Sequence, residues 1–143
     1  MKNFLILLFA ITIISCSKDE PIPDPIPSKV LIKRIQVTGL PAVENNGTNW
    51  DFDGTRPDVY MRASFGYTSN ILVNYNYSNV EFTVNTIVNY NQAVDLWVFD
   101  KDQFNDDDYI CGITFDLTPK YRTTSMKHLA GNQEYLITYD LIY

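Results

Sequence analysis

The chain has 143 residues, with 17 acidic against 11 basic side chains and a formal net charge of −6 at pH 7. This length suits one domain with a short extension. No basic stripe is present to contact phosphates, so we expect no nucleic-acid partner. The negative charge also argues against charge-driven docking on anionic lipid unless a cation intervenes.

The first fifteen residues have the pattern of an export signal. Lys2 precedes an apolar run from Phe4 to Ile14 that is too short to span a bilayer as a helix. The ending Ile13-Ile14-Ser15-Cys16 resembles a bacterial lipobox, in which the cysteine thiol receives a diacylglycerol group. An ordinary signal peptide cleaved after another small residue is the alternative. The resemblance implies that residues 1–15 are a lipoprotein signal peptide and that Cys16 is the lipid-anchored N-terminus.

Residues 16–28 are rich in proline and are expected to form a linker. Four prolines alternate with other residues, which favours extended polyproline II. At ~3.1 Å per residue the linker would hold a domain roughly 35 Å from the lipid surface. A recognition peptide for a proline-binding partner is the alternative. The SKDE sequence after Cys16 resembles the export signals of surface lipoproteins in the Bacteroidota, which implies the outer membrane, on its periplasmic or its outer face.

Residues 29–143 have the pattern of β-strands rather than helices. Short alternating or β-branched runs are separated by turn residues such as Asn45-Asn46-Gly47. The segment from Lys120 to Gly131 is irregular, and we expect a long loop or one or two helical turns there. The sequence therefore predicts an all-β domain, an antiparallel β-sandwich of about eight strands. The clearest runs are Val30–Val37, Val59–Phe65, Ile71–Tyr77, Val80–Val88, Ala93–Phe99, Tyr109–Leu117 and Glu134–Tyr143.

Aromatic residues suggest two sheet faces. From Tyr135 to Tyr143 every second residue is aromatic or aliphatic, so we expect that face to lie in the core. Residues 73–79 and 88–92 alternate Asn with Tyr, which suggests neighbouring strands with a shared tyrosine face. Cross-strand aromatic pairing is one interpretation of this pattern, and an aromatic platform for sugars is the other.

The most acidic stretch, DKDQFNDDDYI, runs from Asp100 to Ile110 between two strand-like runs. At an effective dielectric constant of ~20, two like unit charges 4 Å apart cost about 4 kcal/mol. Lys101 alone is too little to neutralise the five aspartates, and we expect Asp106 and Asp107 to point outward. The remaining carboxylates must be spaced by solvent, partly protonated, or neutralised by a cation.

The spacing of the other three aspartates is distinctive. Asp100, Asp102 and Asp108 stand at i, i+2 and i+8 and are followed by two apolar or aromatic residues. This pattern resembles the third loop of C2 domains, the calcium- and lipid-binding sandwiches of protein kinase C and the synaptotagmins. Cys111 takes the position of a glycine in that pattern, and Gly112 follows it.

A second acidic region strengthens the resemblance to C2 domains. In the first loop of that family a Leu-Pro pair precedes one acidic residue, and another lies just before a strand beginning with Tyr-Val. Leu40-Pro41 and Asp58 fit these positions. The first acidic position is open: Asp51 is favoured, with Asp53 and Glu44 as alternatives.

The resemblance implies a calcium site between the two loops and a binding function. Ca²⁺ takes six to eight oxygen ligands and tolerates irregular geometry. The implied partner is a phospholipid, a glycan or an envelope protein, besides the membrane reached through the lipid anchor. A metal-independent structural or adhesive subunit of an envelope complex is the alternative. The expected calcium ligands are Asp51, Asp58, Asp100, Asp102 and Asp108, with Asp53 and Glu44 as possible additions.

We expect no enzymatic activity. His128 is the single imidazole, and no partner for nucleophilic catalysis or zinc binding stands at a suitable spacing. Cys111 is expected to pack inside a strand as a small hydrophobe. The carboxylates are expected to cluster, whereas a glycoside hydrolase needs two separated carboxyl groups that act as acid and base. A cluster fits ion binding better than glycoside hydrolysis. A hydrolase that uses the acidic cluster is the weaker alternative.

Overall fold

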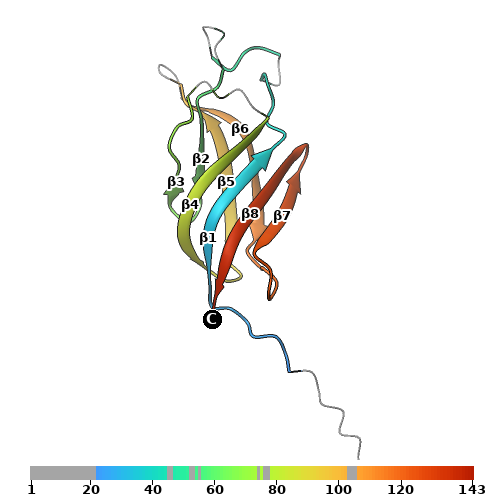
Figure 1. The fold of residues 1–143 in the computed structure, drawn as a ribbon. Helices are drawn as coiled ribbons and strands as arrows, with labels where there is room; N and C mark the ends of the chain where they lie inside the picture. Colours follow the sequence, from blue (N-terminus) through green and yellow to red (C-terminus); the bar gives the residue numbers. More distant parts are fainter. Residues whose placement is uncertain are drawn as a thin grey trace, which may run out of the picture.

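The computed structural model describes residues 22–44, 47–51, 54, 56–73, 75, 78–102 and 106–143. These residues form eight strands in two antiparallel four-stranded sheets, with the orders β4-β1-β8-β7 and β3-β2-β5-β6 (Figure 1). The predicted antiparallel β-sandwich is therefore confirmed. The strands are β1 (Lys29–Thr38), β2 (Val59–Ala63), β3 (Tyr67–Thr68), β4 (Asn79–Asn89), β5 (Ala93–Asp100), β6 (Asp108–Asp116), β7 (Ser125–Ala130) and β8 (Gln133–Ile142).

The core lies between the two sheets and follows the two-residue period of the strands. In β5 every second residue from Val94 to Asp100 is buried, and the residues between them are partly exposed. In β8 the inward residues Tyr135, Ile137 and Tyr139 are at most 1% exposed. The core face predicted for the last strand is confirmed for these residues. Tyr143 lies beyond the end of β8 and is 58% exposed.

Two predictions of local structure were wrong, one of a strand and one of a loop or helical turns. The expected strand at 71–77 is absent among its described residues, where Leu72 forms only an isolated bridge to Val59. On the side of β2 away from β5, the partner is instead the two-residue strand β3. The segment expected to be a loop or helical turns contains β7, whose residues are alternately exposed and half-buried. Its inward positions include His128 and Ala130, so an edge strand paired on one side with β8 shows a weak hydrophobic alternation.

The two Asn/Tyr segments do not form one face. Tyr75 precedes β4 and Tyr90 follows it, so the two tyrosines are separated by the length of an eleven-residue strand. Both rings pack against the core near opposite ends of the sandwich. The predicted shared tyrosine face is therefore wrong for Tyr75 and Tyr90, and Tyr77 lies outside the described residues.

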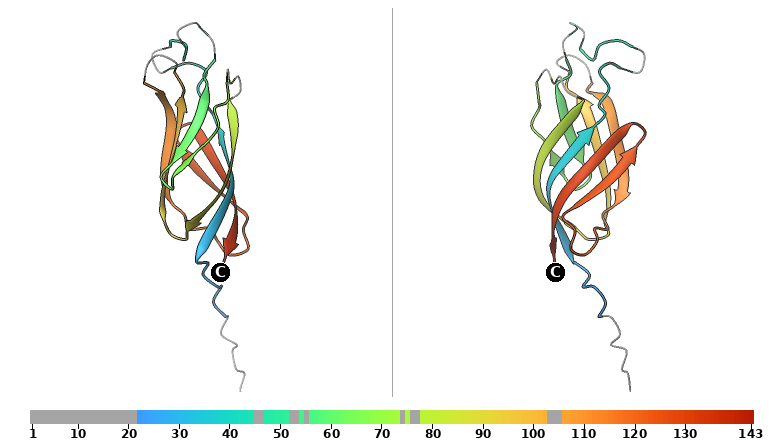
Figure 2. Two further views of the ribbon diagram at one scale, coloured as in Figure 1. Left: turned by 90° about the vertical axis from the view of Figure 1, so that its left-hand side faces the viewer. Right: turned by 45° about the vertical axis from the view of Figure 1, so that its right-hand side comes forward.

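The acidic loops and the linker lie at opposite ends of the domain. The β1–β2, β3–β4 and β5–β6 connections gather at the end that is uppermost in Figure 1, and both views of Figure 2 agree. The chain enters β1 at the other end, where the Ser28 N–H donates to the Ile142 carbonyl at 2.8 Å. Of the linker, Ile22 and Ile26 are described and are 92% and 78% exposed. Cys16 and the predicted signal peptide lie outside the described residues. Within those residues, the chain has no helix that could cross a membrane.

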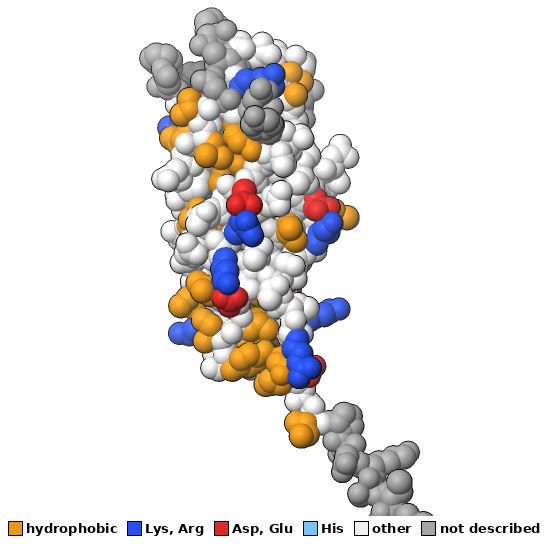
Figure 3. Space-filling view, viewed as in Figure 1, with side chains coloured by type: hydrophobic (Ala, Val, Ile, Leu, Met, Phe, Trp, Pro, Cys, Tyr) orange, Lys and Arg blue, Asp and Glu red, His pale blue; other side chains and the backbone are white. Residues whose placement is uncertain are grey.

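The outward face of the β4-β1-β8-β7 sheet is balanced in charge. Acidic and basic side chains lie there in pairs (Figure 3), and each pair is largely exposed, so its contribution to stability is small. This balance leaves the loop end as the region where acidic residues outnumber basic ones. The pairs are Lys33–Asp140 at 2.7 Å, Arg34–Glu81 at 3.2 Å and Lys127–Glu134 at 2.8 Å.

The contact between the end of β1 and the β7–β8 turn should tolerate no side chain at Gly39. Gly39 has a φ of +81°, and an added Cβ would collide with the Asn132 carbonyl oxygen. Gly47 has a φ of +84° but no heavy atom within 4 Å of an added Cβ. A substitution at Gly47 therefore measures the cost of the backbone conformation alone, without a steric clash. We expect Gly47→Ala to lower the free energy of unfolding by about 1 kcal/mol. Gly39→Ala should cost about 1–3 kcal/mol more. Equal costs in urea denaturation would contradict this packing.

Candidate functional site

The ends of β2 and β5 bring the two acidic loops together. Val59 pairs with Asp100 across the two strands. The Asp58 backbone N–H donates to Asp100 Oδ1 at 2.7 Å, and the Lys101 N–H donates to the Asp58 carbonyl at 3.0 Å. We call this pair of contacts the β2–β5 clasp. It joins the loop before β2 to the loop after β5, which are more than forty residues apart in the chain.

Asp100 is a fully buried acid. Its side chain is 0% exposed, and its Oδ2 atom has no hydrogen-bond partner among the described residues. Burial raises the pKa of Asp100 to about 6, and the negative charges of Asp51, Asp102 and Asp58 act in the same direction. The hydrogen bond from the Asp58 N–H opposes this shift. At pH 7 the carboxyl is therefore mostly ionised, at a cost in free energy.

Asp102 shows the same conflict nearer the surface. Its Oδ2 atom is buried and unpartnered within the described part of the chain. Burial raises the pKa of Asp102 first, and the neighbouring charges of Asp108, Asp51 and Asp107 raise it further, while Lys101 lowers it. The Oδ2 atoms of Asp100 and Asp102 thus lie at one end of the sandwich without the hydrogen bonds, among the described residues, that normally accompany burial.

An acidic hollow opens beside Asp102. Its volume is about 520 Å³, and it is walled by Glu44, Asp51, Asp102 and Asp108. Buried Trp50 also lines it and is held by a 3.2 Å hydrogen bond from its ring N–H to the Pro41 carbonyl.

The hollow and the clasp place the candidate calcium ligands differently. Asp51, Asp102, Asp108 and the alternative Glu44 line the hollow, whereas Asp58 and Asp100 form the clasp. The remaining alternative, Asp53, lies outside the described residues. Across the described ranges, no three His, Cys, Asp or Glu side chains are grouped closely enough to hold a metal ion. The hollow is therefore an open acidic site rather than a formed coordination shell.

The expectation for Asp107 was wrong. Its side chain is only 14% exposed and contacts Lys101 Nζ at 2.5 Å and Arg62 at 3.5 Å. The Tyr60 hydroxyl donates to the same carboxylate. Hydrogen bonds, from Lys101 first and then from Tyr60, hold the pKa of Asp107 below its usual range. Lys101 therefore neutralises Asp107, while Asp106 is exposed as expected.

An aromatic cluster on the outward face of the second sheet was not predicted. Tyr60 and Phe99 stack at 5.5 Å between ring centroids, and Tyr109 meets Phe99 edge-on at 6.0 Å. The Arg62 guanidinium lies 5.2 Å from the centroids of both stacked rings. The signal was available in β5, where Trp97 and Phe99 occupy the outward positions between buried aliphatic residues.

The fold resembles part of a known enzyme. No family model and no curated protein matches the sequence. Human GIVD cytosolic phospholipase A2 is similar in two solved structures, one with methyl gamma-linolenyl fluorophosphonate and terbium chloride and one with methyl gamma-linolenyl fluorophosphonate alone. The TM-scores are 0.56 and 0.55, at 12% sequence identity. The match covers 84% of this chain but only 18% of the phospholipase chain, and at this identity it shows a shared fold alone.

The buried acid predicts an unusual dependence of stability on pH. As pH rises from about 4 to about 6, the unfolded chain releases the Asp100 proton before the folded protein does. In EDTA the free energy of unfolding should therefore fall across this window, by up to about 3 kcal/mol. The lowered pKa of Asp107 makes the free energy of unfolding rise with pH instead, but only at pH values below the ordinary pKa of an aspartate.

Asp100→Asn tests this dependence, because an amide oxygen still accepts the Asp58 N–H. The variant should be more stable than the parent at pH 7 and should lose most of the slope between pH 4 and 6. Exposed Asp106 in the same loop supplies the control, and Asp106→Asn should keep the slope. Urea denaturation at each pH is the measurement. An unchanged slope in Asp100→Asn would show that Asp100 does not titrate as described.

Proposed function

We propose that this chain is a lipid-anchored binding module of the cell envelope that takes up Ca²⁺ at its acidic loops. One observation carries the proposal: the Asp100 carboxyl is fully buried, with one oxygen unpartnered among the described residues. A buried carboxylate without compensation costs several kcal/mol, roughly, so its retention favours a cation as the missing partner.

The available side chains suit calcium. The unpartnered Oδ2 atoms of Asp100 and Asp102 would be the first ligands. Asp51 and Asp108 would approach from the walls of the hollow, and Asp58 from the clasp. Carboxylate oxygens in irregular geometry are what Ca²⁺ accepts. A bound Ca²⁺ would supply the positive charge that removes the repulsion, and the loops would close to complete the ligand set.

The family resemblance supports the same reading. The i, i+2, i+8 spacing of Asp100, Asp102 and Asp108 resembles the third loop of C2 domains, and the fold is similar to part of a phospholipase A2. The phospholipase structure contained terbium chloride. Terbium is a trivalent cation that, like calcium, binds oxygen ligands, so it is a suitable probe for this chain.

The positions of the proposed anchor and the acidic loops, at opposite ends of the domain, indicate on which side a partner would bind. An anchor at Cys16 and the linker would reach the domain at the end opposite the acidic loops (Figure 1). The loops would then face away from the anchoring outer membrane. The docked phospholipid, glycan or envelope protein would accordingly be met on the side away from the anchor.

Terbium luminescence provides a direct test, because Trp50 lines the hollow and can sensitise a nearby Tb³⁺ ion. We expect a saturable Tb³⁺ signal that Ca²⁺ displaces and that Trp50→Phe removes. Millimolar Ca²⁺ should also raise the Tm, since a ligand at 100 times its Kd stabilises by about 2.7 kcal/mol. The double variant Asp100→Asn/Asp102→Asn should lose both effects, and Asp106→Asn should keep them. An equal response in the double variant, or none in the parent, would rule out the calcium site.

The aromatic cluster favours a second candidate, an adhesive sandwich that needs no metal. Tyr109 is 56% exposed and packs against Phe99, whose ring also lies 5.2 Å from the Arg62 guanidinium. Binding to a purified envelope fraction that persists in EDTA and is lost in Tyr109→Ala would support this candidate. Binding that is lost in EDTA and in Asp100→Asn would support calcium instead.

A further inference from the structure

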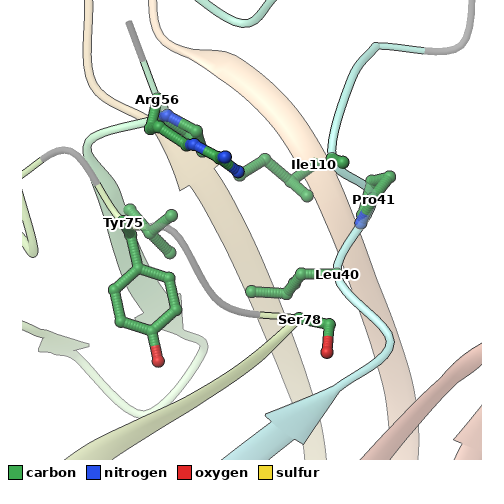
Figure 4. Close-up of a pocket in the computed structure, with 9 residues that line it drawn as sticks. Leu40, Pro41, Arg56, Tyr75, Ser78 and Ile110 are labelled. Carbon is green, nitrogen blue, oxygen red and sulfur yellow. The ribbon is translucent and has the colours of Figure 1, made fainter.

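A second cavity lies at the loop end, separate from the acidic hollow. Its volume is about 200 Å³, and it shares no lining residue with the hollow. Leu40, Val59 and Ile110 supply aliphatic walls, and Tyr75 closes one side (Figure 4). Val59 is 0% and Leu40 9% exposed, so this part of the lining belongs to the packed core. The cavity is therefore a preformed apolar hollow where elements of both sheets meet.

Among the described residues, Arg56 is the one charged side chain that lines this cavity, and no acidic side chain lines it. Its side chain reaches across the cavity toward Ile110 (Figure 4). Arg56 forms no ion pair with any residue in the described part of the chain. A guanidinium at the rim of an apolar hollow is complementary to a planar anion, which it binds through two parallel hydrogen bonds.

We propose that this cavity binds a small amphiphilic monoanion, a carboxylate on a short aliphatic or aromatic tail. The tail would lie against Leu40, Val59 and Ile110, and the carboxylate would bind Arg56. The cavity is smaller than the roughly 300–1,000 Å³ of drug-sized sites, so a short tail fits and a long acyl chain does not. This site goes beyond the proposed calcium site, because the two have no lining residue in common.

Hexanoate and hexan-1-ol are matched probes, since they differ mainly in the charge of the head group. Titration in EDTA, followed by NMR of the Leu40 and Ile110 methyl groups, keeps the result independent of calcium. Hexanoate should shift these resonances saturably and bind about ten-fold more tightly than hexan-1-ol. Arg56→Gln should remove that preference and leave the weaker binding of the alcohol unchanged.

Two further variants separate the pocket from general charge effects. Ala42 is exposed at the cavity lining, and Ala42→Phe should block both probes by filling the entrance. Arg122→Gln makes the same charge change beside Tyr121 and should leave hexanoate binding unchanged. Equal affinity for hexanoate and hexan-1-ol in the parent, full hexanoate binding in Arg56→Gln, or shifts confined to other methyl groups would each overturn the proposal. Loss of Tb³⁺ binding would leave it standing.

Discussion

The arrangement of the loop end depends on one buried carboxyl group. Asp100 ends a core strand at an inward position, and its Oδ1 accepts the backbone N–H that precedes β2. The same hydrogen bond that joins the two loops fixes a negative charge where water does not reach it. Stability alone would favour an amide or an apolar residue there. A carboxylate held at this cost is the kind of group that active or binding sites retain.

The two ends of the sandwich carry different features. The predicted linker enters beside the C-terminus, while the β1–β2, β3–β4 and β5–β6 connections gather at the far end, where the acidic hollow lies (Figure 2). On the outward face of the β4-β1-β8-β7 sheet, three ion pairs balance acidic against basic side chains. The acidic hollow and the cavity at Arg56 are both formed by these connections and strand ends. With the proposed anchor at Cys16, the acidic loops would lie at the end of the domain farthest from the anchor.

Much of the fold was predictable from the sequence, because strands that are buried on one face show a period of two. That holds for β5 and β8, whose inward residues are apolar or aromatic except for Asp100 at the end of β5. It fails for β7, an edge strand whose half-buried positions include His128, and for the described residues among 71–77, which form only an isolated bridge from Leu72 to Val59. The acidic spacing pointed to the loop that meets Asp58. The partners of Asp107 were not predictable, because Arg62 and Tyr60 lie on a distant strand and reach it only through tertiary pairing.

The central claim is that a divalent cation binds to the buried Oδ2 atoms of Asp100 and Asp102. A crystal structure grown with Ca²⁺, or with Tb³⁺ for its anomalous signal, tests it most directly. The account predicts an ion at about 2.3–2.6 Å from Asp100 Oδ2 and Asp102 Oδ2, with Asp51 and Asp108 drawn toward it. A hollow that stays empty at saturating ion, or an ion bound elsewhere with Asp100 protonated, would contradict the account.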